Sequence, residues 1–283
     1  MAANALEVGR AEYAFEFDGQ QLPIGVDVAS AAALTDPIVV VSLHAGGFPW
    51  QHALDAWEQV WPQFGPAAEN LVIFAPQAEQ GETPWWTRTR EFNPSYLAAF
   101  FDRLESVVCL DSSPVFLNGF GQSTVAAVQA HCAGAIDVEL TAIVLLLGMT
   151  TIDGCEPADA VPVISIDRFE FGPAIGPHWD GRWDMPHPID LELTGGLDAT
   201  PDDFAEWAEV YGCDGPPVTD EILDPTGSLD RLTTVLSHRG CRADLVAIGI
   251  AGPSDNSRVF DPVALDQMLQ IVADEFAKLL DGT

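Results

Sequence analysis

The stretch from residue 114 to 132 constrains the fold of this chain more than any other. It reads PVFLNGFGQSTVAAVQAHC, with an apolar run at 115–117 that leads into Gly119. From Ser123 onward, apolar residues recur at spacings of three and four, which is typical of a helix. We therefore predict a buried strand that turns directly into a helix at a glycine-rich corner.

The corner resembles a known motif but lacks its central residue. A strand that turns sharply into a helix is the setting of the G-x-S-x-G motif, which presents a nucleophilic serine at its tip. Here the five positions from Gly119 to Ser123 read Gly-Phe-Gly-Gln-Ser, and the tip is Gly121. The sequence thus predicts the scaffold of a serine nucleophile without the nucleophile itself.

Composition and charge exclude several classes of partner. With 283 residues, of which 48% are apolar, the chain can form a sizeable core. Acidic residues number 43 against 11 basic ones, a formal net charge of −32. Because phosphate groups attract positive charge, we expect no nucleic acid and no anionic membrane as partner. The acids are scattered, so we interpret them as a solvated surface, in its sharper form an adaptation to a salty cytoplasm.

The N-terminus and the cysteines predict a cytoplasmic protein. No apolar run approaches the roughly 20 residues of a membrane-spanning helix. The first ten residues lack the basic and then apolar regions of a signal peptide. The five cysteines show no C-x-x-C spacing, so we expect no metal, no redox motif and no cofactor. An odd number of cysteines in an intracellular chain makes free thiols the default expectation.

The order of the expected elements predicts the fold class. Apolar and polar residues alternate on both sides of Asp18-Gly19, which favours an opening antiparallel hairpin. Strands are then expected at 37–43, 71–76, 115–117, 141–147, 161–166 and 245–250, and helices at about 51–61 and from 94, 123, 201 and 262. This alternation predicts an α/β protein with a doubly wound, mostly parallel sheet of about eight strands. We expect one domain, 1–283, with a long loop excursion over 167–200.

Five segments, in the right order, resemble those of one known family. Residues 43–47, Leu-His-Ala-Gly-Gly, resemble its L-H-G-x-G oxyanion loop, and Trp85-Trp86 falls where it has an aromatic W-x-W segment. Residues 114–132 match its V-Y-x-T-G-x-S-x-G-G…C stretch without a gap, and residues 204–213 and 237–241 resemble its W-A-x-x-N-G-C and later G-C. The chain is similar to the polyhydroxybutyrate depolymerase and feruloyl esterase branch of the α/β-hydrolases.

The resemblance implies an α/β-hydrolase fold and the chemistry of a serine esterase. It also implies that Cys213 and Cys241 form a disulfide, whereas the absence of a visible signal peptide argues for reduced thiols. We therefore expect these two cysteines to lie close together and leave their redox state open.

The resemblance also locates a catalytic triad, and all three positions have changed. Gly121 stands in place of the nucleophile. Phe171 stands where the family's H-G-x-x-D segment has its acid, and Asp255 stands where its G-G-G-H-x-W segment has the histidine base. No histidine follows His238. Three losses in one chain predict lost catalysis, and glycine tolerates the strained backbone of such a corner without steric cost.

Two functional hypotheses follow. The first is a catalytically inactive, esterase-like protein that binds a small molecule or a protein partner. Its ligand niche would be formed by backbone amides around the corner and by nearby aromatic side chains; the candidates are His44, Ala45, Gly46, Gln122, Trp85 and Trp86. Trp179 and Trp183 would line or plug the same niche. His44 also has a structural interpretation, in which it holds the oxyanion loop.

The second hypothesis is an active serine esterase with relocated catalytic residues. Ser123 would be its nucleophile, His178 or His187 its base and Glu170 its acid. The plainer interpretation of Ser123 is an ordinary residue in the first turn of the helix. The histidines then pack in the loop excursion, and Glu170 is one of many acids.

Overall fold

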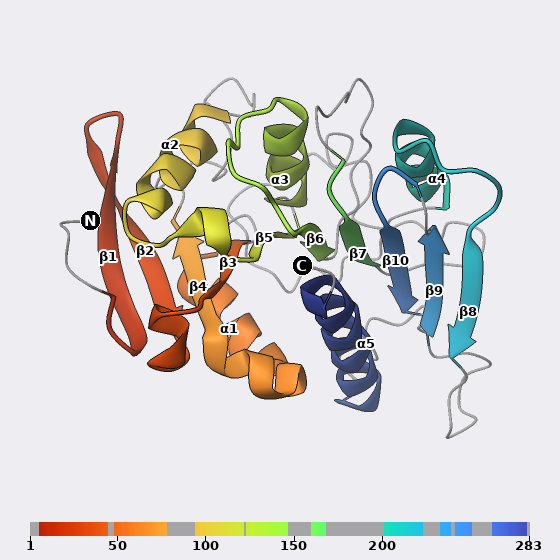
Figure 1. Ribbon diagram of the computed structural model, residues 1–283, viewed down its shortest axis with the longest axis horizontal. Helices are drawn as coiled ribbons and strands as arrows, with labels where there is room; N and C mark the ends of the chain where they lie inside the picture. The colour runs from red at the N-terminus through yellow and green to blue at the C-terminus, as the bar shows by residue number, and fades with distance from the viewer. Residues whose placement is uncertain are drawn as a thin grey trace, which may run out of the picture.

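The computed structural model describes residues 6–44, 48–77, 94–121, 123–146, 160–167, 201–222, 233–238, 241–250 and 262–281. The strands in these ranges form one sheet in the order β1-β2-β4-β3-β5-β6-β7-β10-β9-β8 (Figure 1). Their bounds are β1 Gly9–Phe17, β2 Gln20–Val28, β3 Ile38–Leu43, β4 Leu71–Pro76, β5 Val115–Phe120, β6 Ala142–Leu146, β7 Val163–Asp167, β8 Val218–Ile222, β9 Thr233–His238 and β10 Leu245–Ile250.

Five α-helices accompany the strands in the same ranges. They are α1 Gln51–Val60, α2 Pro94–Glu105, α3 Ser123–Cys132, α4 Pro201–Val210 and α5 Pro262–Asp281. Short 3₁₀ segments cover Ala32–Leu34, Trp61–Asn70 and Leu110–Ser112. None of the helices in the described ranges combines the length and the apolar character that crossing a bilayer requires.

The opening hairpin follows from its turn residues. Asp18 and Gly19 both have positive φ, 51° and 76°, and the flanking residues Phe17 and Gln20 are paired. Positive φ at both central residues defines the type I′ turn, whose twist matches that of antiparallel strands. The predicted hairpin is confirmed, and β2 then pairs antiparallel with β4.

The centre of the sheet is parallel, and its edges are antiparallel. Strands β4, β3, β5, β6, β7 and β10 pair side by side in parallel. Helices cover both faces of these strands, which explains their continuous apolar runs. The predicted doubly wound, mostly parallel sheet is confirmed.

The sheet has more strands than the sequence predicted. It contains ten strands in the described ranges rather than about eight, because β8 and β9 extend the edge beyond β10 as an antiparallel pair. The segment of β8 reads Val-Thr-Asp-Glu-Ile, with two adjacent acids, and did not stand out as a strand. Charged side chains are common on edge strands, where they prevent pairing with a further strand.

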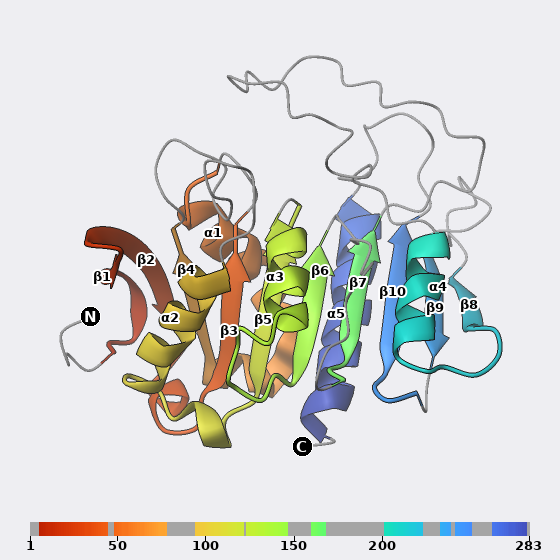
Figure 2. The same ribbon diagram turned by 90° about the horizontal axis from the view of Figure 1, so that it is seen from above.

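Helices α2, α3 and α4 lie on one face of the sheet, and α1 and α5 lie on the other (Figure 2). Each face has its own apolar cluster. Within β3, Val39, Val41 and Leu43 face the cluster under α2 and α3, whereas Ile38 and Val40 face the cluster under α1 and α5. This alternation is the period of two that any strand imposes on its side chains.

The middle of the sheet holds the feature that defines the fold. Strand β4 pairs on one side of β3 and β5 pairs on the other, so the direction of winding reverses between β3 and β5. A parallel sheet with a sharp, glycine-containing turn from a central strand into a helix is the α/β-hydrolase arrangement. Of the predicted excursion, residues 168–200 lie outside the described residues.

Candidate functional site

The glycine corner, residues 119–123, lies where the sequence predicted it, between β5 and α3. Gly121 has a φ of +58°, a left-handed conformation that glycine adopts without steric cost. Its amide donates to the carbonyl of Leu146 in β6 at 2.8 Å. Its carbonyl accepts from the amide of Thr124 at 3.1 Å and from the Thr124 hydroxyl at 2.7 Å. The corner is therefore held by both its neighbouring strand and its own helix.

Gly119 is required by close packing rather than by backbone conformation. A Cβ at this position would lie 2.7 Å from Cα of Thr124 and 2.8 Å from the carbonyl oxygen of Ser123. Both atoms belong to the first turn of α3, which starts directly against the end of β5. Only a glycine allows the backbones to approach this closely.

Ser123 is fully buried, with 0% exposure. Its hydroxyl lies 2.7 Å from the carbonyl oxygen of Leu43 at the end of β3, to which it donates, and it accepts from the amide of Phe120 at 2.7 Å. The side chain therefore ties the ends of β3 and β5 together. This is the geometry of a structural hydroxyl, because a nucleophile must be exposed to its substrate.

A buried polar network lies directly under the corner. The indole of Trp57 donates to the hydroxyl of Ser42 at 3.0 Å, and that hydroxyl donates to the side-chain oxygen of Asn118 at 2.8 Å. The amide nitrogen of Asn118 donates to the carbonyl of Val144 at 3.1 Å. The network joins α1, β3, β5 and β6, and its bonds fix the positions of the strands that carry the corner.

The sequence analysis missed this network. Its signal was the presence of Ser42 and Asn118 in otherwise apolar strand runs, where a polar side chain is expected to find a partner.

His44 is buried at the end of β3, with 1% exposure. Its Nε2 lies 3.2 Å from the amide nitrogen of Gln77, which follows β4. The side-chain oxygen of Gln77 accepts from the backbone amide of Trp50, and its backbone carbonyl accepts from the hydroxyl of Tyr96 at 2.8 Å. These contacts favour the structural interpretation of His44, which braces the start of the following loop.

The other residues predicted for the site cannot be placed. The niche candidates Ala45, Gly46, Gln122, Trp85 and Trp86 and the altered triad positions Phe171 and Asp255 lie outside the described residues. So do Glu170, His178, Trp179, Trp183 and His187. The niche and the relocated esterase site therefore stay predictions.

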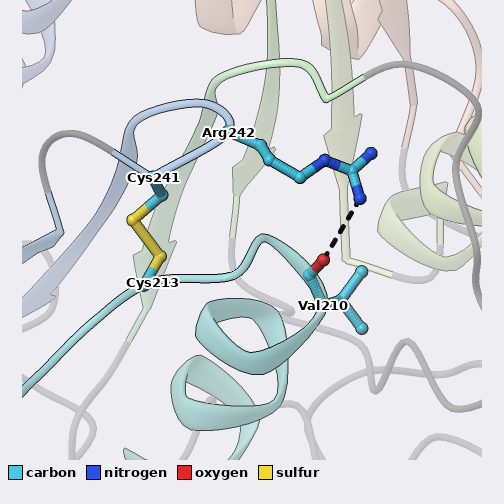
Figure 3. Close-up of a disulfide and its surroundings, with 4 residues drawn as sticks. All are labelled: Val210, Cys213, Cys241 and Arg242. Carbon is cyan, nitrogen blue, oxygen red and sulfur yellow. Dashed lines mark hydrogen bonds between the residues drawn. A yellow bond between two sulfur atoms is a disulfide. The ribbon is translucent and has the colours of Figure 1, made fainter.

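A second group of reactive side chains lies near the β9–β8 edge of the sheet. Cys213 follows α4, His238 ends β9, and Cys241 opens the segment before β10. Cys213 and Cys241 form a disulfide with a Cα–Cα distance of 4.6 Å (Figure 3). We call these three residues the cysteine corner. The resemblance to the esterase branch implied this cysteine pair.

The default expectation of free thiols is wrong for three of the five cysteines. Cys213, Cys241 and Cys132 are disulfide-bonded, and Cys109 is free and exposed. The expectation rested on an intracellular location and an odd number of cysteines. The fold instead brings distant thiols within bonding distance, which linear spacing does not reveal.

Backbone hydrogen bonds place Cys213 at the end of α4. Gly212 has a φ of +65°, and its amide donates to Glu209 at 3.0 Å while the amide of Cys213 donates to Ala208 at 2.8 Å. This pair of bonds is the Schellman motif, which ends a helix at a left-handed glycine. The local sequence Gly212-Cys213 thus fixes the direction of the cysteine.

Hydrogen bonds from Arg242 and to Val161 hold the same turn after α4. The backbone amide of Arg242 donates to the carbonyl of Tyr211 at 3.0 Å, and its guanidinium donates to the carbonyl of Val210 at 3.5 Å (Figure 3). The hydroxyl of Tyr211 donates to the carbonyl of Val161 at 2.8 Å. Burial raises the pKa of Tyr211 to about 12. The turn after α4 is thereby joined to the segments that lead into β7 and β10.

Comparison with known proteins gives structural likeness only. No family model matches the chain, and no curated protein matches it. An acetyl xylan esterase from Aspergillus awamori aligns over 86% of this chain and 93% of its own, with 13% identity and a TM-score of 0.49. A thermostable esterase aligns over 56% of this chain, with 14% identity and a TM-score of 0.41. A serine hydrolase without a lid from Xanthomonas campestris aligns over 58% of this chain and 73% of its own, with 14% identity and a TM-score of 0.36.

These likenesses do not extend to activity or substrate. The chain spans 46% of the length of the thermostable esterase. The α/β-hydrolase fold rests on the strand order and on the glycine corner described above.

Proposed function

We propose that this protein is a non-catalytic member of the α/β-hydrolase fold that binds a small molecule or a protein partner beside the glycine corner. One observation carries the proposal. The tip of the corner, where a hydrolase presents its nucleophile, is Gly121. The hydroxyls of Ser123 and Thr124 that follow it are buried, and each is hydrogen-bonded to backbone groups. A serine esterase needs an exposed hydroxyl at this place.

The position of the corner supports a binding role. Winding reverses between β3 and β5, and ligands of open α/β sheets bind beyond the carboxyl ends of the strands at such a reversal. The buried network of Ser42, Trp57 and Asn118 keeps these strand ends rigid. A rigid end of the sheet is suited to hold a ligand.

A covalent probe tests the absence of catalysis. The unmodified protein, treated with a fluorophosphonate, should stay unlabelled, and its turnover of short-chain p-nitrophenyl esters should stay at background. Labelling at Ser123 would overturn the proposal and establish the relocated esterase in its place. The serine hydrolase from Xanthomonas campestris named above serves as the positive control for labelling, and the acetyl xylan esterase serves as the positive control for ester turnover.

Restoring the nucleophile alone should not restore activity. Triad members act as a unit, so Gly121→Ser without a base should also stay near background. The triple variant Gly121→Ser, Phe171→Asp, Asp255→His rebuilds the constellation that the resemblance implies. Activity in the triple variant and not in the single one would support both the alignment of the three positions and the loss of catalysis in the natural chain.

Native mass spectrometry tests the binding role. A ligand retained through purification should add a discrete mass under non-denaturing conditions that disappears on denaturation. An unlabelled, inactive protein that retains no mass and whose melting temperature no ester or carboxylic acid shifts would leave the binding half of the proposal without support.

The branch and the cellular setting belong to the same proposal. The disulfide between Cys213 and Cys241 is the pairing that the polyhydroxybutyrate depolymerase and feruloyl esterase branch implies, and it supports that assignment. It also favours an oxidising compartment over the cytoplasm that the sequence predicted. Alkylation of thiols before lysis of the source cells distinguishes the two compartments, because only reduced cysteines are alkylated.

The acidic surface belongs to the cellular setting as well. A melting temperature that rises from low to molar potassium chloride would support adaptation to salt, since screening relieves the repulsion of 32 net negative charges.

A further inference from the structure

The cysteine corner contains more ligand atoms than its disulfide uses. The two sulfurs and a ring nitrogen of His238 all lie within 4.8 Å of one another. His238 and Cys241 are separated by two residues, the spacing that is common between neighbouring zinc ligands. Cys213 comes from a distant part of the chain, 28 residues before Cys241. We propose that, once its disulfide is reduced, this corner binds a zinc ion through Cys213, His238 and Cys241.

The geometry is close to what zinc requires. In a tetrahedral site with zinc–sulfur bonds of about 2.3 Å and a zinc–nitrogen bond of about 2.0 Å, the ligand atoms lie roughly 3.5–3.8 Å apart. The three atoms already lie within 4.8 Å, so small side-chain rotations bring them into range. Three protein ligands leave the fourth position to water, because the cysteines are half-buried rather than sealed.

Each ligand is positioned before any metal arrives. The Schellman turn at Gly212 sets the direction of Cys213. The imidazole of His238 is buried, with 7% exposure, and stacks on the ring of Phe204 with centroids 5.5 Å apart and planes 22° apart. Cys241 adjoins Arg242, whose amide holds the carbonyl of Tyr211. A preorganised donor set lowers the entropic cost of binding.

The redox step has a defined balance. A dithiol reductant supplies two electrons and two protons, its own thiols become a disulfide, and Cys213 and Cys241 become thiols. Binding of Zn²⁺ then releases the two thiol protons and leaves two thiolates whose charge balances that of the ion. The neutral imidazole supplies the third bond. The strongly negative chain also raises the local concentration of divalent cations.

The consequence is a cross-link between α4 and the β9–β10 region under both redox conditions. The disulfide makes it where the surroundings are oxidising, and zinc makes it where they are reducing. The site thereby keeps the edge of the sheet joined to α4 in either compartment.

Cobalt, a spectroscopic substitute for zinc, tests the site in the full chain. After reduction with a phosphine, titration with Co²⁺ should produce a thiolate-to-cobalt charge-transfer band that saturates at one Co²⁺ per chain. Addition of Zn²⁺ should then remove the band. The oxidised protein should lack the band. Carboxylates do not produce it, so the acidic surface does not interfere. A reduced, folded protein without the band would overturn the proposal.

Variants separate this site from other thiols. Cys213→Ser should abolish the band, and His238→Gln should weaken zinc binding by more than the roughly 10–100-fold that loss of an outer-shell partner costs. Cys109→Ser, which makes the same change at the free and exposed thiol, should leave the band intact. If His238→Gln binds as the natural chain does, or if the band depends on Cys109, the three-ligand site is refuted.

A stability measurement covers the case in which reduction unfolds the protein. Zinc should raise the melting temperature of the reduced chain, and Cys213→Ser should lose this increase. A reduced chain whose melting is the same with and without zinc, or whose increase survives Cys213→Ser, excludes the site.

Discussion

The glycine corner and the cysteine corner differ in whether their polar side chains are already engaged in fixed interactions or can still bind or react. At the glycine corner the hydroxyl of Ser123, and next to the corner the side chains of Ser42 and Asn118, are buried and engaged in hydrogen bonds that join strands. At the cysteine corner, two sulfurs and an imidazole face one another, and their only covalent link is a bond that reductants reverse.

This difference indicates which polar groups of the molecule stabilise the fold and which can take part in reactions. A polar atom already satisfied by the fold contributes stability, whereas one held in place with spare bonding capacity contributes reactivity. By this criterion, the described polar side chains of the glycine corner contribute to stability, whereas the cysteine corner holds the groups with reactivity left. Four variants, one of them double, test this contrast.

Removal of the disulfide should have the largest effect. The double variant Cys213→Ser, Cys241→Ser should lose roughly 3–4 kcal/mol in the free energy of unfolding under oxidising conditions, as expected for a closed loop of about 28 residues. Urea denaturation measures the loss. In reductant without zinc, the variant and the natural chain should be equally stable. A difference that persists there would mean that the serines disturb the fold by themselves.

Filling the space at Gly119 should have the next largest effect. Gly119→Ala places a Cβ 2.7 Å from Cα of Thr124 and should cost about 3 kcal/mol, because backbone rather than a flexible side chain must move. Gly134→Ala is the matched control. It also lies beside α3 and has a φ of +60°, but it has nothing within 4 Å of the added Cβ, so it should cost only about 1 kcal/mol of conformational strain. Equal losses would contradict the close approach.

Ser123→Ala should lower the free energy of unfolding by about 2 kcal/mol. The substitution leaves the amide of Phe120 and the carbonyl of Leu43 without the hydroxyl that joins them. The control Ser113→Ala removes an exposed hydroxyl that donates to Cys109, and it should change stability by less than about 0.5 kcal/mol. A Ser123→Ala protein as stable as the natural one, but with lower esterase turnover, would reverse our assignment of this hydroxyl.

Tyr211→Phe should have the smallest effect, about 1 kcal/mol near pH 8, because the carbonyl of Val161 loses its donor. The pH dependence has a definite sign. Burial favours the neutral phenol, so its contribution to stability is present below the unfolded pKa near 10 and is lost as pH rises through the folded pKa of about 12. The stability deficit of Tyr211→Phe should therefore narrow from pH 10 to 12. A deficit that stays constant would show that the phenol does not titrate as a buried group.

Sequence patterns predicted the centre of the sheet and the hairpin at one edge better than the β8–β9 edge. The runs that became β3, β4, β5 and β10 are apolar apart from Ser42 and Asn118 because both of their faces are covered, and this pattern is visible in a linear chain. Strands β8 and β9 gain much of their stability from pairing with each other and with β10. Such pairing depends on partners that the local sequence does not reveal.

The sequence by itself determined the hairpin turn at Asp18-Gly19, the glycine corner and the absence of a serine at its tip, because each depends on backbone conformation or residue identity at neighbouring positions. Only the tertiary structure decided which hydroxyls form buried hydrogen bonds and which cysteines form disulfides. Ser123 lies 80 residues from Leu43, and Cys213 lies 28 residues from Cys241. Contacts across such separations are set by the winding of the sheet, which brings segments together regardless of their spacing along the chain.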